Sequence, residues 1–137
     1  MRQVFADTAY WLALTNPFDQ HHDKATRASA SLQGKRIVTS DAVLTEYLNA
    51  LADKGSTVRL AAVLSVERIL RNPGVMVIAQ TRRLFVKGFA LYKARADKGY
   101  SLTDCISMVI MRQRKITNAL TTDHHFEQEG FAALMKQ

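Results

Sequence analysis

Apolar and polar residues follow one another along the chain in blocks that predict strands and helices in turn. Short apolar runs bounded by polar or turn residues favour strands, which we expect at residues 2–6, 36–39, 75–78 and 119–122. Longer segments with apolar residues at helical spacing favour helices, which we expect at residues 8–14, 19–32, 41–52, 57–71, 81–95 and 101–114. Residues 126–135 form a segment too short to assign. This alternation predicts an α/β fold, a parallel β-sheet of four to five strands flanked by helices on both faces.

Cap and turn residues mark several boundaries between these elements. Asp41 is a favourable N-cap for the helix after the second strand. Residues 72–74 read Asn-Pro-Gly, a strong turn before the third strand. Ser101 and Asp104 have the S-x-x-D spacing of a capping box, which places the start of the last long helix. Gly88 lies inside an expected helix, where a glycine costs about 1 kcal/mol relative to alanine.

The length and composition are those of a single globular domain. The 137 residues, 47% of them hydrophobic, suit one domain over residues 1–137 with one core. Apolar runs such as residues 60–64 are far shorter than the ~20 residues of a membrane-spanning helix. Asp7 interrupts the first apolar stretch, so we expect no secretory signal and a cytoplasmic protein. The single cysteine, Cys105, excludes a disulfide within the chain and a cysteine-rich zinc site.

Basic residues outnumber acidic residues. The chain has 19 Lys and Arg against 12 Asp and Glu, and the net charge of +7 favours an anionic partner such as nucleic acid. The basic residues that could contact phosphates form two groups, which are Arg82, Arg83, Lys87, Lys93, Arg95 and Lys98, and then Arg112, Arg114 and Lys115. For each of them a solvated helix face is an equally good explanation.

Acidic residues recur where the predicted strands end. Asp7 follows the first strand, and Asp123 follows the last. Asp41 and Glu46 come after the second strand, and Asp104 opens the last long helix. Parallel strands place their carboxyl ends along one edge of the sheet, where sites form in folds of this kind. We therefore expect acidic side chains from distant parts of the sequence to gather at that edge.

Each acidic position also has a simple structural explanation. Asp104 could merely cap its helix with Ser101, and Asp7 could be a plain N-cap. Glu46 lies toward the polar side of its helix, which suits a solvated residue, and Asp123 suits an ordinary turn. The functional interpretation rests on their convergence, and on the apolar surroundings of Asp104, where a carboxylate is costly to desolvate.

Four converging carboxylates favour a divalent cation. They repel one another and raise one another's pKa, a cost that a bound cation removes. Mg²⁺ suits an all-oxygen site and Mn²⁺ can substitute for it, whereas zinc prefers His or Cys ligands. The histidines occur as the adjacent pairs His21-His22 and His124-His125, and we expect them at the surface.

Four short acidic motifs are spread over nearly the whole chain. Residues 4–8 read Val-Phe-Ala-Asp-Thr, and residues 39–46 run from Thr-Ser-Asp to a glutamate. Residues 102–104 read Leu-Thr-Asp, and residues 121–126 have the pattern T-x-D-x-x-F. In their order and spacing these motifs resemble the PIN-domain ribonucleases, in particular the VapC-type toxins of prokaryotic toxin–antitoxin pairs. Cys105, where a small residue such as alanine is expected, is a minor departure.

This resemblance implies a magnesium-dependent endoribonuclease. It implies that Asp7, Asp104 and Asp123 bind one or two Mg²⁺ directly, and that Glu46 binds a second ion or orients the attacking water. Metal of this kind lowers the pKa of the water and neutralises charge on the leaving oxygen during phosphodiester hydrolysis.

The resemblance also suggests supporting residues and partners. Thr8 and Thr121 are expected to donate hydrogen bonds to a phosphate or to a ligand carboxylate. The expected RNA contacts are Arg82, Arg83, Lys87, Arg112 and Arg114. A cognate antitoxin that inserts into the acidic groove, and a homodimer, are further implications of the resemblance.

Other classes fit the sequence less well. An aspartyl-phosphate phosphatase also places an Asp after the first strand, but needs a second Asp two residues on, where this chain has Ala9. Nucleotide-binding folds need a glycine-rich phosphate loop, and neither G-x-G-x-x-G nor G-x-x-x-x-G-K occurs. The remaining alternative is a non-catalytic PIN-like module that binds RNA or protein, against which the four intact acidic positions argue.

Overall fold

A five-stranded parallel sheet forms the centre of the computed structural model, which describes residues 2–136. The strands are β1 (Gln3–Ala6), β2 (Arg36–Ser40), β3 (Val75–Ile78), β4 (Asn118–Leu120) and β5 (Ala132–Ala133), in the order β3-β2-β1-β4-β5. The helices in this part of the chain are α1 (Thr8–Thr15), α2 (His22–Ala30), α3 (Asp41–Ala50), α4 (Ser56–Arg71), α5 (Arg82–Ala94), α6 (Leu102–Gln113) and α7 (His124–Gln128). The predicted α/β fold with a parallel sheet is confirmed.

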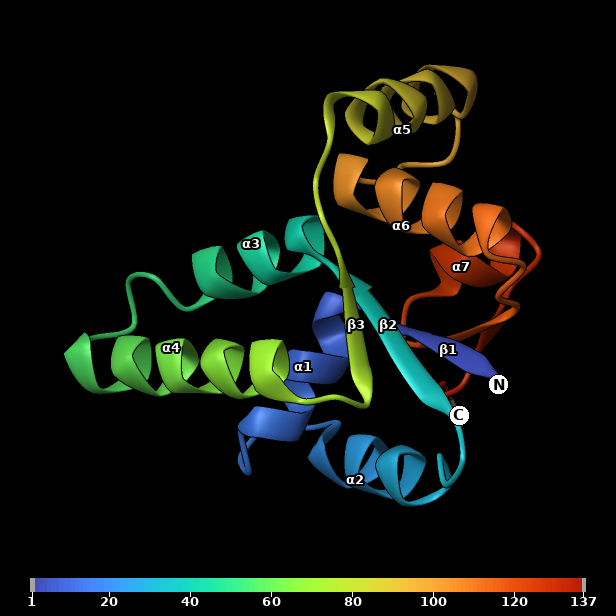
Figure 1. The fold of residues 1–137 in the computed structure, drawn as a ribbon. Coiled ribbons are helices and arrows are strands. Elements are labelled where there is room, and N and C mark those ends of the chain that lie inside the picture. Colours follow the sequence, from blue (N-terminus) through green and yellow to red (C-terminus); the bar gives the residue numbers. More distant parts are fainter. Residues whose placement is uncertain (1, 137) are drawn as a thin grey trace.

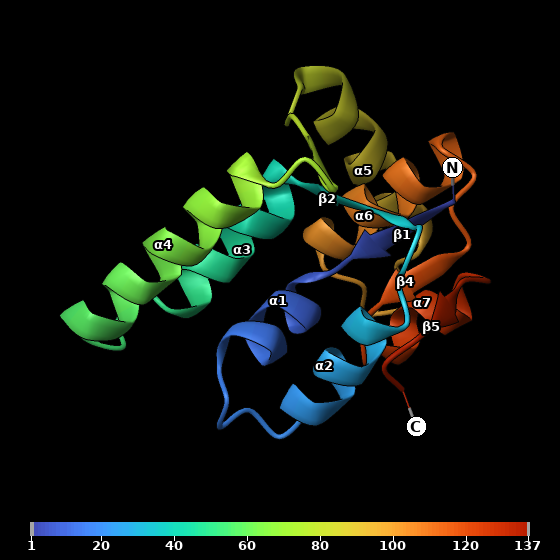
Figure 2. The ribbon, with the colours of Figure 1, turned by 60° about the horizontal axis from the view of Figure 1, so that its bottom comes forward.

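Helices cover both faces of the sheet (Figures 1 and 2). α1 and α2 lie on one side of the strands, and α5 and α6 lie on the other. α3 and α4 lie side by side and project away from the sheet as a pair. Within residues 2–136, every helix is too short or too polar to span a membrane.

The central strand β1 fixes where the candidate site begins. Phe5 pairs in register with Val38 on β2 and with Ala119 on β4, and all three residues are fully buried. A strand that is paired on both edges and covered on both faces requires the continuous apolar run that the sequence has here. The chain leaves β1 at Asp7, so this carboxylate is attached to the most enclosed strand of the sheet.

The N-cap of α3 differs from the prediction by one residue. The hydroxyl of Ser40 caps the helix by accepting a hydrogen bond from the amide of Val43 at 3.1 Å. Asp41 is the first residue of the helix, and its Oδ2 accepts a hydrogen bond from the amide of Gln80 at 3.0 Å. The Asp41 side chain therefore connects α3 to the chain that follows β3, and it does not line the candidate site described below.

Short elements account for the other differences from the prediction. α2 begins at His22, later than expected, because Asp19 Oδ1 accepts a hydrogen bond from the amide of His21 at 2.8 Å and holds these residues in a turn. The unassigned segment near the carboxyl end contains α7, with five residues, and β5, with two. Elements of this length contain too few residues to produce a periodic pattern.

Gly88 allows α5 to pack closely against α6. A Cβ atom at position 88 would lie 2.5 Å from Cγ1 of Ile106 and 3.3 Å from its Cα. The low helix propensity of glycine is thus offset by the close approach of the two helices. Covered by α5 on its outer side, α6 is buried over most of its length, as the apolar residues around Asp104 predict.

Candidate active site at the carboxyl edge of the sheet

Four acidic residues from distant parts of the sequence line one cavity of about 450 Å³. Asp7 follows β1, and Glu46 comes from α3. Asp104 lies in the first turn of α6, and Asp123 directly precedes α7. The other lining residues are Thr8, Ala9, Leu12, Gly99, Ser101, Thr122 and His125. The structure therefore brings together four of the five acidic residues expected at this edge, and Asp41 is the exception.

Asp7 is the most enclosed of the four carboxylates. Its residue is 5% exposed, and its Oδ2 accepts a hydrogen bond from Thr121 Oγ1 at 2.9 Å. Its Oδ1 is buried and has no hydrogen-bond partner among residues 2–136. Asp7 occupies the N-cap position of α1, but its side chain accepts no capping hydrogen bond. The plain N-cap explanation therefore does not account for this residue.

Burial, followed by the nearby charge of Asp104, raises the pKa of Asp7 to about 7. The hydrogen bond from Thr121 opposes this shift. Repulsion between carboxylates is the expected cause of a raised pKa, whereas loss of hydration is the larger cause for Asp7. Without a cation, Asp7 is therefore only partly ionised at neutral pH.

Thr121 connects two of the acidic positions. Its hydroxyl donates to Asp7 Oδ2 and accepts a hydrogen bond from the amide of Asp123 at 3.0 Å. The residue is completely buried. On the other side of the cavity, Thr8 Oγ1 donates a hydrogen bond to Glu46 Oε1. Both supporting threonines thus contact carboxylates of the protein itself, and their predicted contact with a phosphate stays a prediction.

Asp104 caps its helix and lines the cavity at the same time. The Ser101 hydroxyl accepts a hydrogen bond from the Asp104 amide at 3.0 Å, and Asp104 Oδ2 accepts one from the Ser101 amide at 3.2 Å. The predicted capping box is therefore present. Burial raises the pKa of Asp104, and the charges of Asp123 and Glu46 add to this effect. A purely structural cap has no need for this burial among other acids.

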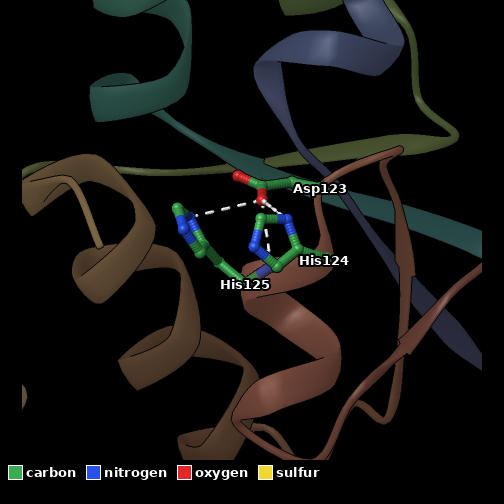
Figure 3. Close-up of side chains that lie close together, drawn as sticks. All are labelled: Asp123, His124 and His125. Atoms are coloured by element: carbon green, nitrogen blue, oxygen red, sulfur yellow. Dashed lines mark hydrogen bonds and ion pairs between the residues drawn. The ribbon is translucent and has the colours of Figure 1, made fainter. Parts of the chain in front are cut away.

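His125 is a residue of the cavity that the sequence analysis places wrongly at the surface. Its Nδ1 lies 3.3 Å from Asp123 Oδ1 and 3.4 Å from Asp104 Oδ2, and its side chain is 22% exposed. Figure 3 shows its ring facing the carboxylate of Asp123. The Asp123 side chain accepts a hydrogen bond from the His125 amide at 2.9 Å, which fixes the start of α7 and turns this ring inward.

The other histidines differ from one another in their surroundings. The His124 side chain is 60% exposed, as expected, although its Nδ1 lies 3.7 Å from Asp123 Oδ1. His22 is half-buried, and its Nδ1 lies 2.8 Å from the carbonyl oxygen of Ala13. His21 is also half-buried. The surface prediction is therefore correct for His124 alone, because the local chain path encloses His125 and partly encloses both His21 and His22.

The predicted RNA contacts lie in three structural settings. Arg82, Arg83 and Lys87 are exposed on α5. Arg112 is already engaged, because its guanidinium lies 3.1 Å from Glu129 Oε2 and donates a hydrogen bond to the carbonyl oxygen of Glu129 at 2.9 Å. Arg114, the C-cap of α6, lies at the opposite end of that helix from Asp104 and lines a different cavity. Their contact with RNA stays a prediction.

Glu129 forms a polar cluster behind the acidic cavity. Arg95 binds both of its carboxylate oxygens, at 3.0 and 2.9 Å, and the Tyr100 hydroxyl donates to it at 2.9 Å. These hydrogen bonds, that from Arg95 above all, lower the pKa of Glu129. The cluster connects the end of α5 and the loop before α6 to the segment that follows α7, and so holds the two segments that carry Asp104 and His125.

The donor atoms of the cavity fit a divalent cation. A buried carboxylate oxygen without a partner, such as Asp7 Oδ1, is unfavourable unless a proton or a cation is bound. Asp104 and Asp123 supply further carboxylate oxygens. His125 adds a ring nitrogen close to both. The sequence predicts a site with oxygen donors alone, whereas the structure offers one nitrogen donor as well. A set of donors that combines carboxylate oxygens with an imidazole nitrogen suits Mn²⁺ better than it suits Mg²⁺.

Comparisons with known proteins point to one family. The sequence profile of the PIN domain matches residues 4–131. The 23S rRNA-specific endonuclease VapC20 of Mycobacterium tuberculosis is 29% identical over 136 residues, which cover 93% of this chain and 95% of that protein. The crystal structure of Mycobacterium tuberculosis VapC20, described as a sarcin-ricin loop cleaving toxin, has a TM-score of 0.83 at 32% identity and covers 94% of this chain and 96% of that chain. VapBC2 of Rickettsia felis, bound to a DNA fragment from its promoter, shares the fold with a TM-score of 0.69 at 12% identity over 96% of each chain.

The chain belongs to the PIN domain family. Within this family it is similar to VapC20 over nearly its full length, in sequence and in structure. The resemblance to PIN-domain ribonucleases of the VapC type, inferred from four acidic motifs, is confirmed, and so is the predicted nuclease class.

Proposed function

We propose that this chain is an endoribonuclease of the VapC toxin type that uses Mg²⁺, with Mn²⁺ as a substitute, to cleave RNA phosphodiester bonds. The observation that carries the proposal is the unpartnered, buried Asp7 Oδ1 in a cavity that also contains Asp104, Asp123 and Glu46. A protein that only binds RNA gains nothing from this arrangement, because buried carboxylates repel phosphates and destabilise the fold.

Asp7, Asp104 and Asp123 are the residues that would hold the cation, with His125 next to two of them. A divalent cation bound there would activate a water molecule as the nucleophile and would neutralise charge on the phosphate and on the leaving oxygen. Asp7 must be ionised to act as a ligand, and the cation supplies the positive charge that favours this form at neutral pH.

Glu46 orients the attacking water. Its Oε1 accepts the hydrogen bond from Thr8, and this contact fixes the carboxylate beside the first residue of α1. The other oxygen, Oε2, is the one that accepts a hydrogen bond from water. Thr121 positions Asp7 and Asp123 relative to each other, and the capping box with Ser101 fixes the rotation of the Asp104 side chain.

The relatives support a substrate, and the resemblance to VapC-type toxins implies the partners. VapC20 acts on 23S rRNA and is described as a toxin that cleaves the sarcin-ricin loop. We take structured ribosomal RNA as the substrate of this chain, and cytoplasmic ribosomes as its place of action. A cognate antitoxin restrains it by inserting into the acidic groove, and the active form is a homodimer.

Cleavage of purified 23S rRNA in the presence of Mg²⁺ tests the proposal. Asp7→Asn and Asp104→Asn should each abolish cleavage while the protein stays folded. Asp41→Asn is the matched control, because Asp41 is also acidic and also follows a strand, but lies outside the cavity. RNA that is bound but left intact by the wild type, in both Mg²⁺ and Mn²⁺, would instead favour the non-catalytic PIN-like binding module.

A further inference from the structure

A second cavity, of about 340 Å³, lies at the opposite edge of the sheet. It is formed by the amino ends of β1 and β4, the turn before β2 and the end of α6. Four of its lining residues are basic: Arg2, Lys35, Arg114 and Lys115. We call this feature the basic cavity.

The charges of the basic cavity are not neutralised by the protein. No carboxylate lines it, and none of its four basic side chains has an ion pair within the part of the chain that the structure describes. Arg114 Nε donates only a long hydrogen bond, 3.4 Å, to the amide oxygen of Gln3. Arg95 and Arg112, in contrast, both contact Glu129. Four like charges around one hollow repel one another, and a bound anion removes this cost.

The end of α6 explains only half of this charge. Basic residues are favourable at the carboxyl terminus of a helix, and this accounts for Arg114 and Lys115. It does not account for Arg2 or Lys35, which belong to no helix. Lys115 also has a φ of 57°, a left-handed conformation that usually favours glycine at this position after a helix.

We propose that the basic cavity binds the phosphodiester backbone of the RNA substrate, at nucleotides distant from the bond that is cleaved. This inference rests on the proposed function. No aromatic side chain lines the cavity, so it offers no surface on which a base could stack. Four positive charges exceed what one phosphate neutralises and match several phosphates of a strand. They position the RNA and read no sequence.

The two cavities are a strand's length apart. β1 runs from Gln3, which lines the basic cavity, to Ala6, which precedes Asp7. At about 3.3 Å per residue, the path from Gln3 to Asp7 is roughly 13 Å. Because β1 is buried, an RNA that contacts both edges must follow a longer path around the surface, which a structured RNA can do and a trinucleotide held at the acidic cavity cannot. Loss of basic charge at the second cavity should therefore affect long substrates and spare short ones.

Binding and cleavage by a double variant test this inference. Arg2→Gln/Lys35→Gln removes two charges from the basic cavity, and Lys54→Gln/Arg68→Gln removes two exposed charges from the α3–α4 region as a matched control. Binding of a ribosomal RNA stem-loop is measured in EDTA, where cleavage does not occur. We expect the first variant to lose about tenfold or more in affinity, and the slope of log K against log salt to fall by about 0.9 per lost phosphate contact. Its cleavage of a trinucleotide in Mg²⁺ should equal that of the wild type.

Several outcomes would overturn the inference. One is equal affinity of the cavity variant and the wild type for the stem-loop. Another is an equal loss of affinity in the control variant, which would indicate that the RNA is attracted only by the net charge of the protein. If inorganic phosphate raises the melting temperature of the wild type but not of the cavity variant, while RNA affinity is unchanged, the cavity binds small anions instead. Lys35→Gln alone replaces the double variant if the latter melts at a lower temperature.

The same experiment separates this inference from the proposed function. If the wild type cleaves neither the stem-loop nor the trinucleotide, the proposed nuclease function fails. If the wild type cleaves both RNAs and the cavity variant binds and cleaves the stem-loop as the wild type does, only the role of the basic cavity fails.

Discussion

The hydroxyl of Thr121 lies 2.9 Å from Oδ2 of Asp7, although 114 positions of the chain separate the two residues. Thr121 follows β4 and Asp7 follows β1, and these two strands are neighbours in the sheet. The contact is the one hydrogen bond that the Asp7 carboxylate receives from a side chain among the described residues. The alignment of two strand ends thus sets the position of the most enclosed acid.

Thr121→Val should destabilise the protein without changing the volume that the side chain occupies in the core. The substitution keeps the size of the side chain and removes the donor, so that both oxygens of Asp7 are left without a partner. We expect the free energy of unfolding to fall by about 1 to 3 kcal/mol at pH 8, where Asp7 is ionised. Urea denaturation measures this loss. Thr121→Ser retains the hydroxyl and should recover most of the stability, whereas equal stability of the two variants would contradict the role of the hydrogen bond.

Asp7→Asn should stabilise the metal-free protein at high pH. The pKa of Asp7 is about 7 in the folded protein and near 3.8 in the unfolded chain, so the folded state holds the proton more tightly. The wild type therefore loses stability as the pH rises from about 4 to 7, by up to about 1.4 kcal/mol for each pH unit between the two values. The variant lacks this loss.

Urea denaturation in EDTA at several pH values checks the effect of Asp7→Asn. The two proteins should be similar in stability near pH 4 and should diverge toward pH 8. Added Mg²⁺ should stabilise the wild type and leave the variant unchanged. Curves that run parallel across the whole range would show that Asp7 is not the residue that titrates, and Asp41→Asn serves as the control with an ordinary acid.

His125→Gln should weaken the binding of a divalent cation. The ring contacts Asp104 and Asp123, so its loss frees both carboxylates to move. Groups that orient metal-binding residues typically contribute about 10- to 100-fold to metal affinity or activity. Isothermal titration with Mn²⁺ measures the affinity directly. His124→Gln is the matched control from the adjacent, exposed position, and an equal effect of the two substitutions would exclude a specific role for His125.

Glu129→Gln should reduce stability at neutral pH and have less effect in acid. The pKa of Glu129 is lowered by its contacts, first of all that with Arg95, so its contribution to stability is present above pH 4.5 and is lost as the pH falls further. We expect a loss of about 1 to 3 kcal/mol at pH 7, because the carboxylate accepts several charge-assisted hydrogen bonds. Thermal melts at pH 7 and pH 3 compare the two conditions. A loss of the same size at both would contradict the assignment.

Much of the site could be predicted because it follows the sheet. The apolar run of β1 locates Asp7, and the short strand before residue 121 locates Asp123 in the same way. The capping spacing of Ser101 and Asp104 gives the start of α6 to the residue. In each case a local pattern of a few residues fixes where an element ends, and parallel strands bring those ends together.

The contacts that prediction missed depend on tertiary packing. Ser40 and Asp41 are adjacent and equally suited to cap α3, and only the position of Gln80 decides between them. His125 faces the cavity because Asp123 turns the start of a five-residue helix, which is too short to show a pattern. Glu129 meets Arg95 across 34 positions, and nothing near either residue indicates the pair.

The proposed metal ligands come from parts of the fold that differ in stability. Asp7 leaves the central strand, whereas Asp123 and His125 belong to a carboxyl-terminal segment that contains a five-residue helix and a two-residue edge strand. So small a unit opens at a lower free energy than the strands at the centre of the sheet. Moderate heating should therefore displace Asp123 and His125 while the other helices stay formed. Metal binding and RNA cleavage should then be lost at a lower temperature than the overall fold.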